Sequence, residues 1–261
     1  MSHLPALITT VNDPERRLLR GLRGCGAALS TYGAVYAFVT ENTDARVFEG
    51  LCEADVHTEV GPAGVSGIGQ RTVLASAVRA GHNDIFYCDF DRWLHWRGAY
   101  PEELESLPRR IGREYADAWY LCLGRTERAL ATHPVAQSLP ETITNRALSS
   151  VAGNVLDATA GAAWIRLAGA KLILAGSTVN TKATDLEWPG LVLRADRARV
   201  QGAFLEGLEF ETADGYAKEI AGMGSVEAWI RASYDRPEIL RERLQLAAES
   251  ITALMHVTGE R

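Results

Sequence analysis

The chain has 261 residues, of which 47% are apolar, and its formal net charge is −6. This length and apolar content suffice for a sizeable core, and the acidic balance argues against a broad basic surface for nucleic acid. The four cysteines are widely spaced and form no C-x-x-C pair, so neither a zinc site nor a disulfide framework is expected, and a reducing cytoplasm is predicted.

The first elements alternate strand and helix. No secretory leader is recognised at the N-terminus, and the apolar run 6–11 predicts a short strand. The Asp13-Pro14 pair then resembles the cap and first turn of a helix. Its buried stripe, at spacings of four, three and four, would consist of Leu18, Leu22, Cys25 and Leu29.

The alternation continues through the first half of the chain. Further strands are expected at 35–39, 56–60, 84–88 and 118–123, and a helix at 68–80. Strand-helix alternation of this kind predicts a mainly parallel central sheet with helices on both faces, a three-layer α/β/α sandwich. Ligands of such sheets bind at the carboxyl ends of the strands.

The second half contains the longest apolar segment, 160–176. Arg166 and Lys171 interrupt it, and it is shorter than the roughly 20 apolar residues that span a bilayer. No transmembrane segment is therefore expected.

The tail, residues 225–261, predicts two helical pieces broken at Pro237. The second piece carries an apolar stripe formed by Ile239, Leu240, Leu244, Ala247, Ile251 and Leu254. This stripe can pack against its own domain or form a homodimer contact, and we favour the first.

Two carboxylates, Asp89 and Asp91, stand one residue apart just after the apolar run 85–87 of the strand expected at 84–88. Side chains two apart on a strand share one face, so the two charges repel each other unless a positive group lies between them. A divalent metal is one candidate, and solvated carboxylates in a loop are the simpler alternative.

Other polar clusters fall at the same expected edge, after the first two strands and before the helix at 68–80. Turn chemistry alone can explain each of them, but together they could hold a nucleotide. The candidate binding residues are Thr9, Thr10, Asn12, Glu41, Asp44, Gly67 and Arg71, besides Asp89.

In order, the stretches "ITTVNDPE", "FVTENTD", "GIGQR" and "IFYCDFDR" resemble the nucleotide-binding half of GT-A-fold glycosyltransferases. The resemblance is to the inverting group that includes dolichyl-phosphate mannose synthase-like enzymes. It implies a nucleotide-diphospho-sugar transferase fold, with Mn²⁺ or Mg²⁺ held at Asp89 and Asp91. "VTENTD" departs from the family pattern at Glu41 and Asn42, which leaves the base preference open.

The resemblance extends to about residue 190. It places the family's acidic catalytic-base motif at 183–189, where we favour Asp185 as the base and Glu187 second. Trp188 would offer a surface for stacking against a sugar. The Thr184-x-x-Glu187 pattern also has a purely structural explanation, because it matches the capping box of a helix N-terminus.

The resemblance implies one GT-A-like domain over 1–261. Its parts would be a nucleotide-sugar-binding half at about 1–125, an acceptor and catalytic half at about 126–224, and C-terminal helices at about 225–261. The expected function is metal-assisted, inverting transfer of a sugar from a nucleotide-diphosphate donor to an unknown acceptor. The alternatives are a non-catalytic nucleotide-sugar-binding protein, a sugar-nucleotide pyrophosphorylase, or a phosphatase of the haloacid-dehalogenase type that uses the aspartate pair.

Overall fold

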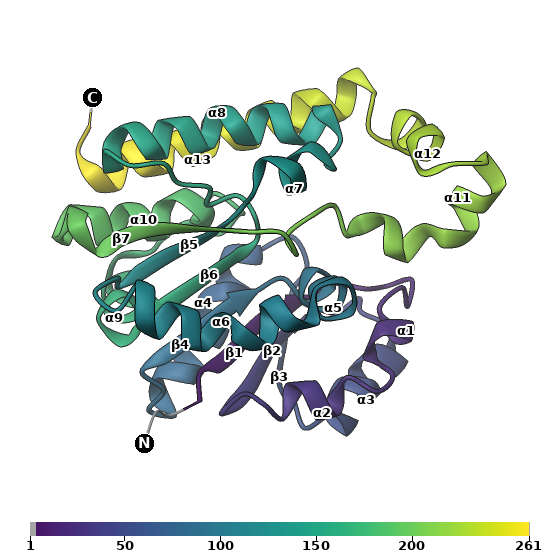
Figure 1. The fold of residues 1–261 in the computed structure, drawn as a ribbon, viewed down its shortest axis with the longest axis horizontal. Coiled ribbons are helices and arrows are strands. Elements are labelled where there is room, and N and C mark those ends of the chain that lie inside the picture. The colour runs from purple at the N-terminus through teal and green to yellow at the C-terminus, as the bar shows by residue number, and fades with distance from the viewer. Residues whose placement is uncertain (1–3, 261) are drawn as a thin grey trace.

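The computed structural model describes residues 4–260, which form one seven-stranded sheet between two layers of helices (Figure 1). The sheet has the order β3-β2-β1-β4-β6-β5-β7. Its strands are β1 (Ala6–Val11), β2 (Ala34–Thr40), β3 (His57–Gly61), β4 (Asp84–Cys88), β5 (Tyr120–Arg125), β6 (Ala162–Arg166) and β7 (Val200–Leu205). The predicted three-layer sandwich with a mainly parallel sheet is confirmed.

One strand, β6, runs against the others: it is antiparallel to both β4 and β5, whereas the remaining pairs are parallel. Cys88 at the end of β4 therefore pairs with Ala162 at the start of β6. As a result, the segment that precedes β6 lies beside the carboxyl end of β4. The sequence pattern did not predict this reversal.

Two hydrophobic cores, one on each face of the sheet, hold the layers together. The first is covered by α1 (Leu19–Leu22), α2 (Gly26–Leu29), α3 (Ala45–Glu53), α5 (Phe90–Ala99) and α6 (Pro101–Glu114). The second is covered by α4 (Ser66–Arg79), α8 (Val135–Ala152), α9 (Leu167–Gly176), α10 (Thr184–Ala195) and α13 (Pro237–Thr258). The remaining helices are α7 (Glu127–Ala131), α11 (Ala217–Met223), α12 (Val226–Ser233) and the short η1 (Arg197–Arg199) and η2 (Thr212–Tyr216).

The single helix predicted after Asp13 is wrong, because the chain forms two short helices, α1 and α2, instead. They are separated at Gly24, whose φ of +79° is left-handed and suits glycine. The side-chain stripe itself is correct: Leu22, Cys25 and Leu29 are buried. Periodicity identified the buried face but not the break in the backbone.

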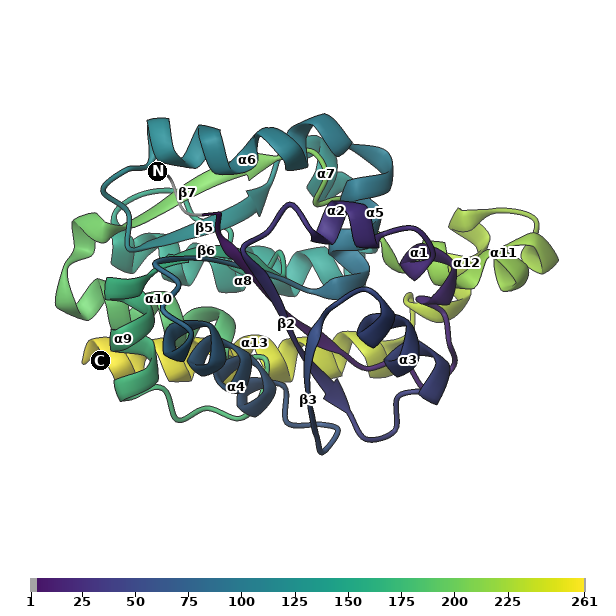
Figure 2. The same cartoon turned by 90° about the horizontal axis from the view of Figure 1, so that it is seen from below.

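The tail forms α12 and α13, and α13 begins at Pro237 as predicted. Leu254, on its apolar stripe, is buried against the chain's own core, and α13 packs on α8 and α10. The two long helices α8 and α13 lie side by side, whereas α11 and α12 project at one end of the molecule (Figures 1 and 2). The homodimer contact stays a prediction. Within residues 4–260, none of the helices combines the length and the apolar character needed to cross a bilayer.

Candidate active site

Two cavities meet at the carboxyl edge of the sheet. The larger is a cleft of about 1200 Å³ between the ends of β1 and β2, α1, and the segment around η2. The smaller, of about 160 Å³, lies beneath α8 and α13. Asp89 and Asp91 line both, so the aspartate pair stands where the two cavities join.

The reversed strand β6 helps to fix the aspartates. The backbone N–H of Asp89 donates to the carbonyl of Gly161, just before β6, at 2.9 Å. Gly161 has a φ of +67°, and a Cβ there would lie 2.8 Å from the Asp89 carboxylate. Only glycine allows this approach. Asp89 then precedes the first residue of α5, and Asp91 lies in the first turn of that helix.

The surroundings of the two aspartates differ. Asp89 accepts a hydrogen bond from the Tyr87 hydroxyl at 2.5 Å, and Lys182 Nζ lies 3.9 Å from its other oxygen. Asp91 accepts only the backbone N–H of Arg92, at 2.9 Å, among the hydrogen bonds of residues 4–260. Desolvation at the base of the cleft, and then the charge of Asp89, raise the pKa of Asp91, although solvent reaches its side chain through the cleft. An uncompensated carboxylate of this kind suits a cation.

The donor set fits a hard divalent cation whose remaining ligands come from a substrate. In the described chain no three His, Cys, Asp or Glu side chains cluster closely enough to hold a metal by themselves. Mg²⁺ in particular is usually bound by one or two carboxylates together with substrate phosphates and water. The aspartate pair supplies that number of carboxylates.

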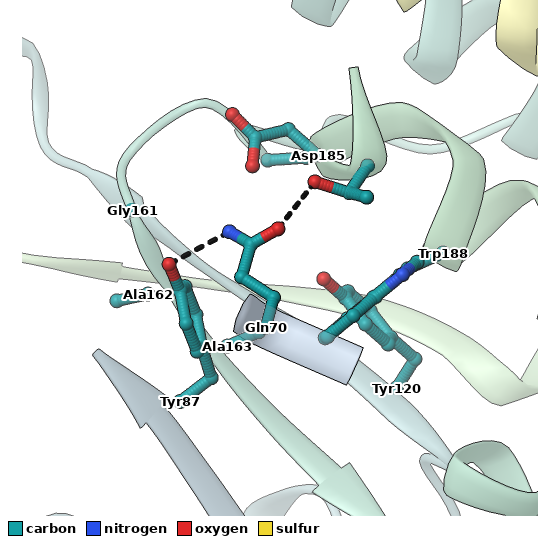
Figure 3. A pocket seen from close by; sticks show the side chains of 10 residues that line it. Gln70, Tyr87, Tyr120, Gly161, Ala162, Ala163, Asp185 and Trp188 are labelled. Carbon is teal, nitrogen blue, oxygen red and sulfur yellow. Dashed lines mark hydrogen bonds between the residues drawn. The ribbon is translucent and has the colours of Figure 1, made fainter. Parts of the chain in front are cut away.

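A buried chain of hydrogen bonds reaches Asp89 from the side of α10, and Figure 3 shows the two bonds that Gln70 makes in it. The Thr184 hydroxyl donates to Gln70 Oε1 at 2.5 Å, and Gln70 Nε2 donates to the Tyr87 hydroxyl at 2.7 Å. Tyr87 donates in turn to Asp89. The chain thereby connects the first turn of α10 to the aspartate through α4 and β4.

Replacing Tyr87 by Phe is expected to interrupt this chain. Gln70 Nε2 loses its acceptor in a buried place, which costs about 1–3 kcal/mol of folding free energy. Urea denaturation measures this loss. Tyr120→Phe is the matched control, because Tyr120 lines the same void and its hydroxyl has no hydrogen bond within residues 4–260. Equal stability changes in the two variants would contradict the role given to Tyr87.

Asp185 lies close to this network, in the first turn of α10 (Figure 3). It lines both the 160 Å³ cavity and a void of about 10 Å³ behind it. Burial raises the pKa of its carboxyl to about 8; Lys182 opposes the shift and Asp89 adds to it. A carboxyl with a pKa near the operating pH can act as a general base.

Glu187 and Trp188 are occupied elsewhere. Glu187 is 1% exposed, and its carboxylate accepts the backbone N–H groups of Thr178 and Val179 at 2.7 and 3.0 Å. Trp188 is buried and donates to the Ser177 hydroxyl at 3.2 Å. Both side chains anchor the segment between α9 and α10, and neither lines the large cleft or the 160 Å³ cavity.

Arg71 and Gly67 hold the same segment from α4. Arg71 donates to Asn180 Oδ1 at 2.5 Å and to the Val179 carbonyl, and does not pair with the aspartates. The N–H of Gly67 donates to the carbonyl of Asn180 at 3.1 Å. The nucleotide-binding role predicted for these two residues remains a prediction, whereas their observed contacts are those of a helix-to-loop joint.

Gly67→Ala is expected to disrupt the packing of α4 against the segment between α9 and α10. A Cβ at this position would lie 2.4 Å from the Val179 carbonyl oxygen, so backbone must move, and overpacking of this kind costs about 1–3 kcal/mol. Chemical denaturation should show the loss. Gly98→Ala, in α5 with nothing within 4 Å, should change stability in the opposite direction by about 0.4–1 kcal/mol. Two changes of the same sign would refute the steric argument.

The predicted nucleotide-binding residues of β1 and β2 separate into three groups. Thr10 and Asn12 line the large cleft. Thr9 is fully buried and does not line the cleft. Glu41 is exposed outside the cleft, and Asp44 accepts the N–H of Arg46 as the cap of α3. The structure thus brings Thr10 and Asn12 together with the aspartates, whereas Thr9, Glu41 and Asp44 lie outside the cleft.

Sequence reasoning missed Lys182, Gln70 and Glu211. Lys182 is the cation nearest to Asp89, and it lies in the turn just before α10, three residues ahead of Asp185. That spacing could have revealed it. Glu211, which pairs with Arg92 at 3.0 Å, comes from a segment after β7 that carries no recognisable pattern.

No protein-family model matches the chain, and no curated protein matches it. Solved structures do resemble it. Glucosyl-3-phosphoglycerate synthase from Mycobacterium tuberculosis in complex with uridine diphosphate matches with a TM-score of 0.57 at 10% identity, over 99% of this chain and 81% of that one. The same enzyme with Mn²⁺, UDP-glucose and phosphoglyceric acid gives 0.53 at 10% identity, over 99% and 80%. A mycobacterial protein gives 0.59 at 10% identity, over 99% and 76%. The chain therefore has the GT-A fold predicted from its motifs.

Proposed function

We propose that this protein is a glycosyltransferase that uses a nucleotide-diphosphate sugar and a divalent cation, Mn²⁺ or Mg²⁺. The observation that carries the proposal is the position of Asp89 and Asp91 at the junction of two cavities, with Asp185 in the smaller one. The fold neighbours add support, since their structures contain Mn²⁺ and UDP-glucose.

The large cleft would take the donor. Thr10, Asn12 and the backbone around Gly64 line its nucleotide side, and the aspartates lie at its inner end. Asp91, assisted by Asp89, would hold the cation, which supplies Lewis-acid stabilisation to the departing diphosphate. Lys182 adds a fixed positive charge that faces both cavities.

The smaller cavity would take the acceptor. Asp185 is the carboxylate placed there to accept the proton of an attacking hydroxyl, and Glu187 is not, because its oxygens are engaged with the backbone. A base that activates the acceptor directly implies one displacement and inversion at the sugar carbon. The inverting mechanism and the single-domain organisation are parts of this proposal.

A thermal-shift screen tests the proposal. UDP-, GDP-, ADP- and dTDP-sugars are added with and without Mn²⁺, and a ligand present at 100 times its Kd stabilises the folded state by about 2.7 kcal/mol. At least one donor should raise Tm in a metal-dependent way. If none does so with metal present, the proposed function fails.

A further inference from the structure

One wall of the large cleft belongs to an arm, residues 212–228, which comprises η2, α11 and the start of α12. None of the residues 212–228 is buried, whereas Glu211 before the arm and Trp229 after it are 8% and 3% exposed. Figures 1 and 2 show α11 and α12 projecting at one end of the molecule. Segments with few buried contacts open at a small free-energy cost, so this wall of the cleft can move.

The chain just before the arm is fixed to the body of the protein. The backbone N–H groups of Glu206 and Gly207 donate to the Glu103 carboxylate at 3.0 and 2.9 Å. The buried ion pair of Arg92 and Glu211, at 3.0 Å, follows directly. These bonds end where the arm begins, so the arm extends from a rigid support.

Two side-chain contacts tether the arm to residues across the cleft. Asp214 Oδ2 lies 2.7 Å from His95 Nδ1 on α5. The guanidinium carbon of Arg17 lies 3.4 Å from the centre of the Tyr216 ring, which is a cation–π contact. His95 and Arg17 both line the large cleft. Arginine keeps its charge at every pH at which the protein is folded, so of these two tethers the one to His95 is sensitive to pH.

Both ring nitrogens of His95 face carboxylates. Nε2 lies 3.2 Å from Glu209 Oε1, while Nδ1 contacts Asp214. A carboxylate only accepts, and an imidazole donates from both nitrogens only when it is protonated. Burial lowers the pKa of His95, but the hydrogen bonds and charges of Asp214 and Glu209 raise it by more. Loss of the proton leaves a lone pair facing one carboxylate and removes the charge from the other hydrogen bond.

Other ionisable groups surround this site. Arg128 on α7 and the Tyr100 hydroxyl donate to the second oxygen of Glu209, at 2.6 and 3.2 Å. Burial raises the pKa of Glu209, and the bonds from Arg128 and His95 lower it by more, so Glu209 stays charged. The elements packed against α5, and α5 itself, add further charged groups, none of which bonds to His95 within residues 4–260: Arg20 on α1, Glu103 on α6, and Asp91, Arg92 and Arg97 on α5.

We propose that the arm is a movable wall of the large cleft and that protonated His95 holds it closed against α5. Deprotonation weakens the tether to Asp214 and leaves the contact of Arg17 in place, so the arm opens more often. The ordinary pKa of histidine is about 6.5 and the closed arm raises it, so the tether is complete below about pH 6.5 and weakens as pH rises through the raised pKa. That the cleft holds a nucleotide sugar rests on the proposed function, but the motion of the arm is measurable without a ligand.

Hydrogen–deuterium exchange of the full chain without ligand tests the motion. Exchange of the arm is compared at about pH 5.5 and about pH 8.5, after correction for the intrinsic exchange rate. The arm should open about 3- to 10-fold more at the higher pH, the size of one hydrogen bond. Opening of the arm that does not change with pH overturns the inference.

Two variants remove the tether from opposite sides. Asp214→Asn and His95→Gln should each open the arm at about pH 5.5 to the level that the wild type reaches at about pH 8.5, and should abolish the pH dependence. Asp214 is 64% exposed, so its variant stays informative even if His95→Gln fails to fold. Asp235→Asn, at an exposed position between α12 and α13, is the charge-matched control and should keep the wild-type profile. A wild-type profile in either tether variant contradicts the role of His95.

Donor dissociation provides a separate measurement. A nucleotide sugar bound with Mn²⁺ should leave Asp214→Asn about 3- to 10-fold faster than wild type at about pH 5.5, and at an equal rate at about pH 8.5. Equal dissociation rates at both pH values would overturn the closure of the cleft by the arm. If the arm opens with pH while no nucleotide sugar shifts Tm, the proposed function fails and the movable arm stands.

Discussion

Asp91→Asn should abolish metal-dependent donor binding while leaving the fold intact. The change removes one of two carboxylates at the junction of the cavities and keeps the shape of the side chain. Mutation of a residue that only hydrogen-bonds to a metal ligand lowers metal affinity by about 10- to 100-fold. Loss of a ligand itself should therefore lower metal affinity by about 100-fold or more. Titration of a nucleotide sugar with and without Mn²⁺ measures the effect.

The melting temperature of Asp91→Asn distinguishes a metal ligand from a residue that only stabilises the fold. Desolvation and Asp89 disfavour the charged form of Asp91, so a neutral amide should leave Tm unchanged or raise it at neutral pH. Asp117→Asn is the matched control, since Asp117 is 86% exposed at the opposite edge of the sheet. An Asp91→Asn protein that melts earlier but still binds donor with Mn²⁺ would contradict the metal site.

Asp185→Asn should lower turnover by about 10²- to 10⁴-fold, the usual contribution of a general base. Donor affinity should remain close to that of the wild type, because Asp185 does not line the large cleft. The comparison is between kcat for transfer and the Kd of the donor. A variant with wild-type kcat would end the assignment of the base.

The raised pKa of Asp185 gives this variant a second signature. An unfolded aspartate titrates near pH 4, whereas burial raises the folded pKa to about 8. Between these values the folded state binds more protons than the unfolded one, so this group lowers stability as pH rises. The Tm of Asp185→Asn relative to wild type should therefore grow from about pH 5 to pH 8, and wild-type turnover should rise over the same window. A flat difference would show that the carboxyl is not desolvated.

The first half of the fold was predictable because its strands are short apolar runs bounded by turn residues. β1 and β4 begin and end where expected. Those signals are local. The antiparallel direction of β6 has no local signal, because an apolar run of five residues has the same pattern in either direction. The break at Gly24 depends on the backbone angle φ, which the sequence pattern does not give.

The candidate site was predictable only where chemistry follows directly on a strand. Asp89 and Asp91 met this condition, and Asp185 came from a motif resemblance. Glu187 illustrates the limit: its position at the start of a helix suggests a cap or a base, but its actual partners are two backbone N–H groups of the preceding loop. The lining of the 160 Å³ cavity could not have been selected, because that cavity exists only once α8 and α13 pack together.

That cavity is completed late in the synthesis of the chain. Asp89 and Asp91 are made with the first ninety or so residues, whereas Asp185 and Ser250, which line the same cavity, come much later, and Ser250 follows Asp91 by 159 positions (250 − 91). At a translation rate of about 5–20 residues per second, roughly 8–32 s separate the two. During that interval the nascent chain contains Thr10 and Asn12 of the large cleft but lacks the α13 wall of the smaller cavity. The lining of the larger cleft ends at Val226 and that of the smaller cavity at Ser250, so both depend on the last part of the chain, and the last wall of the larger one is made first.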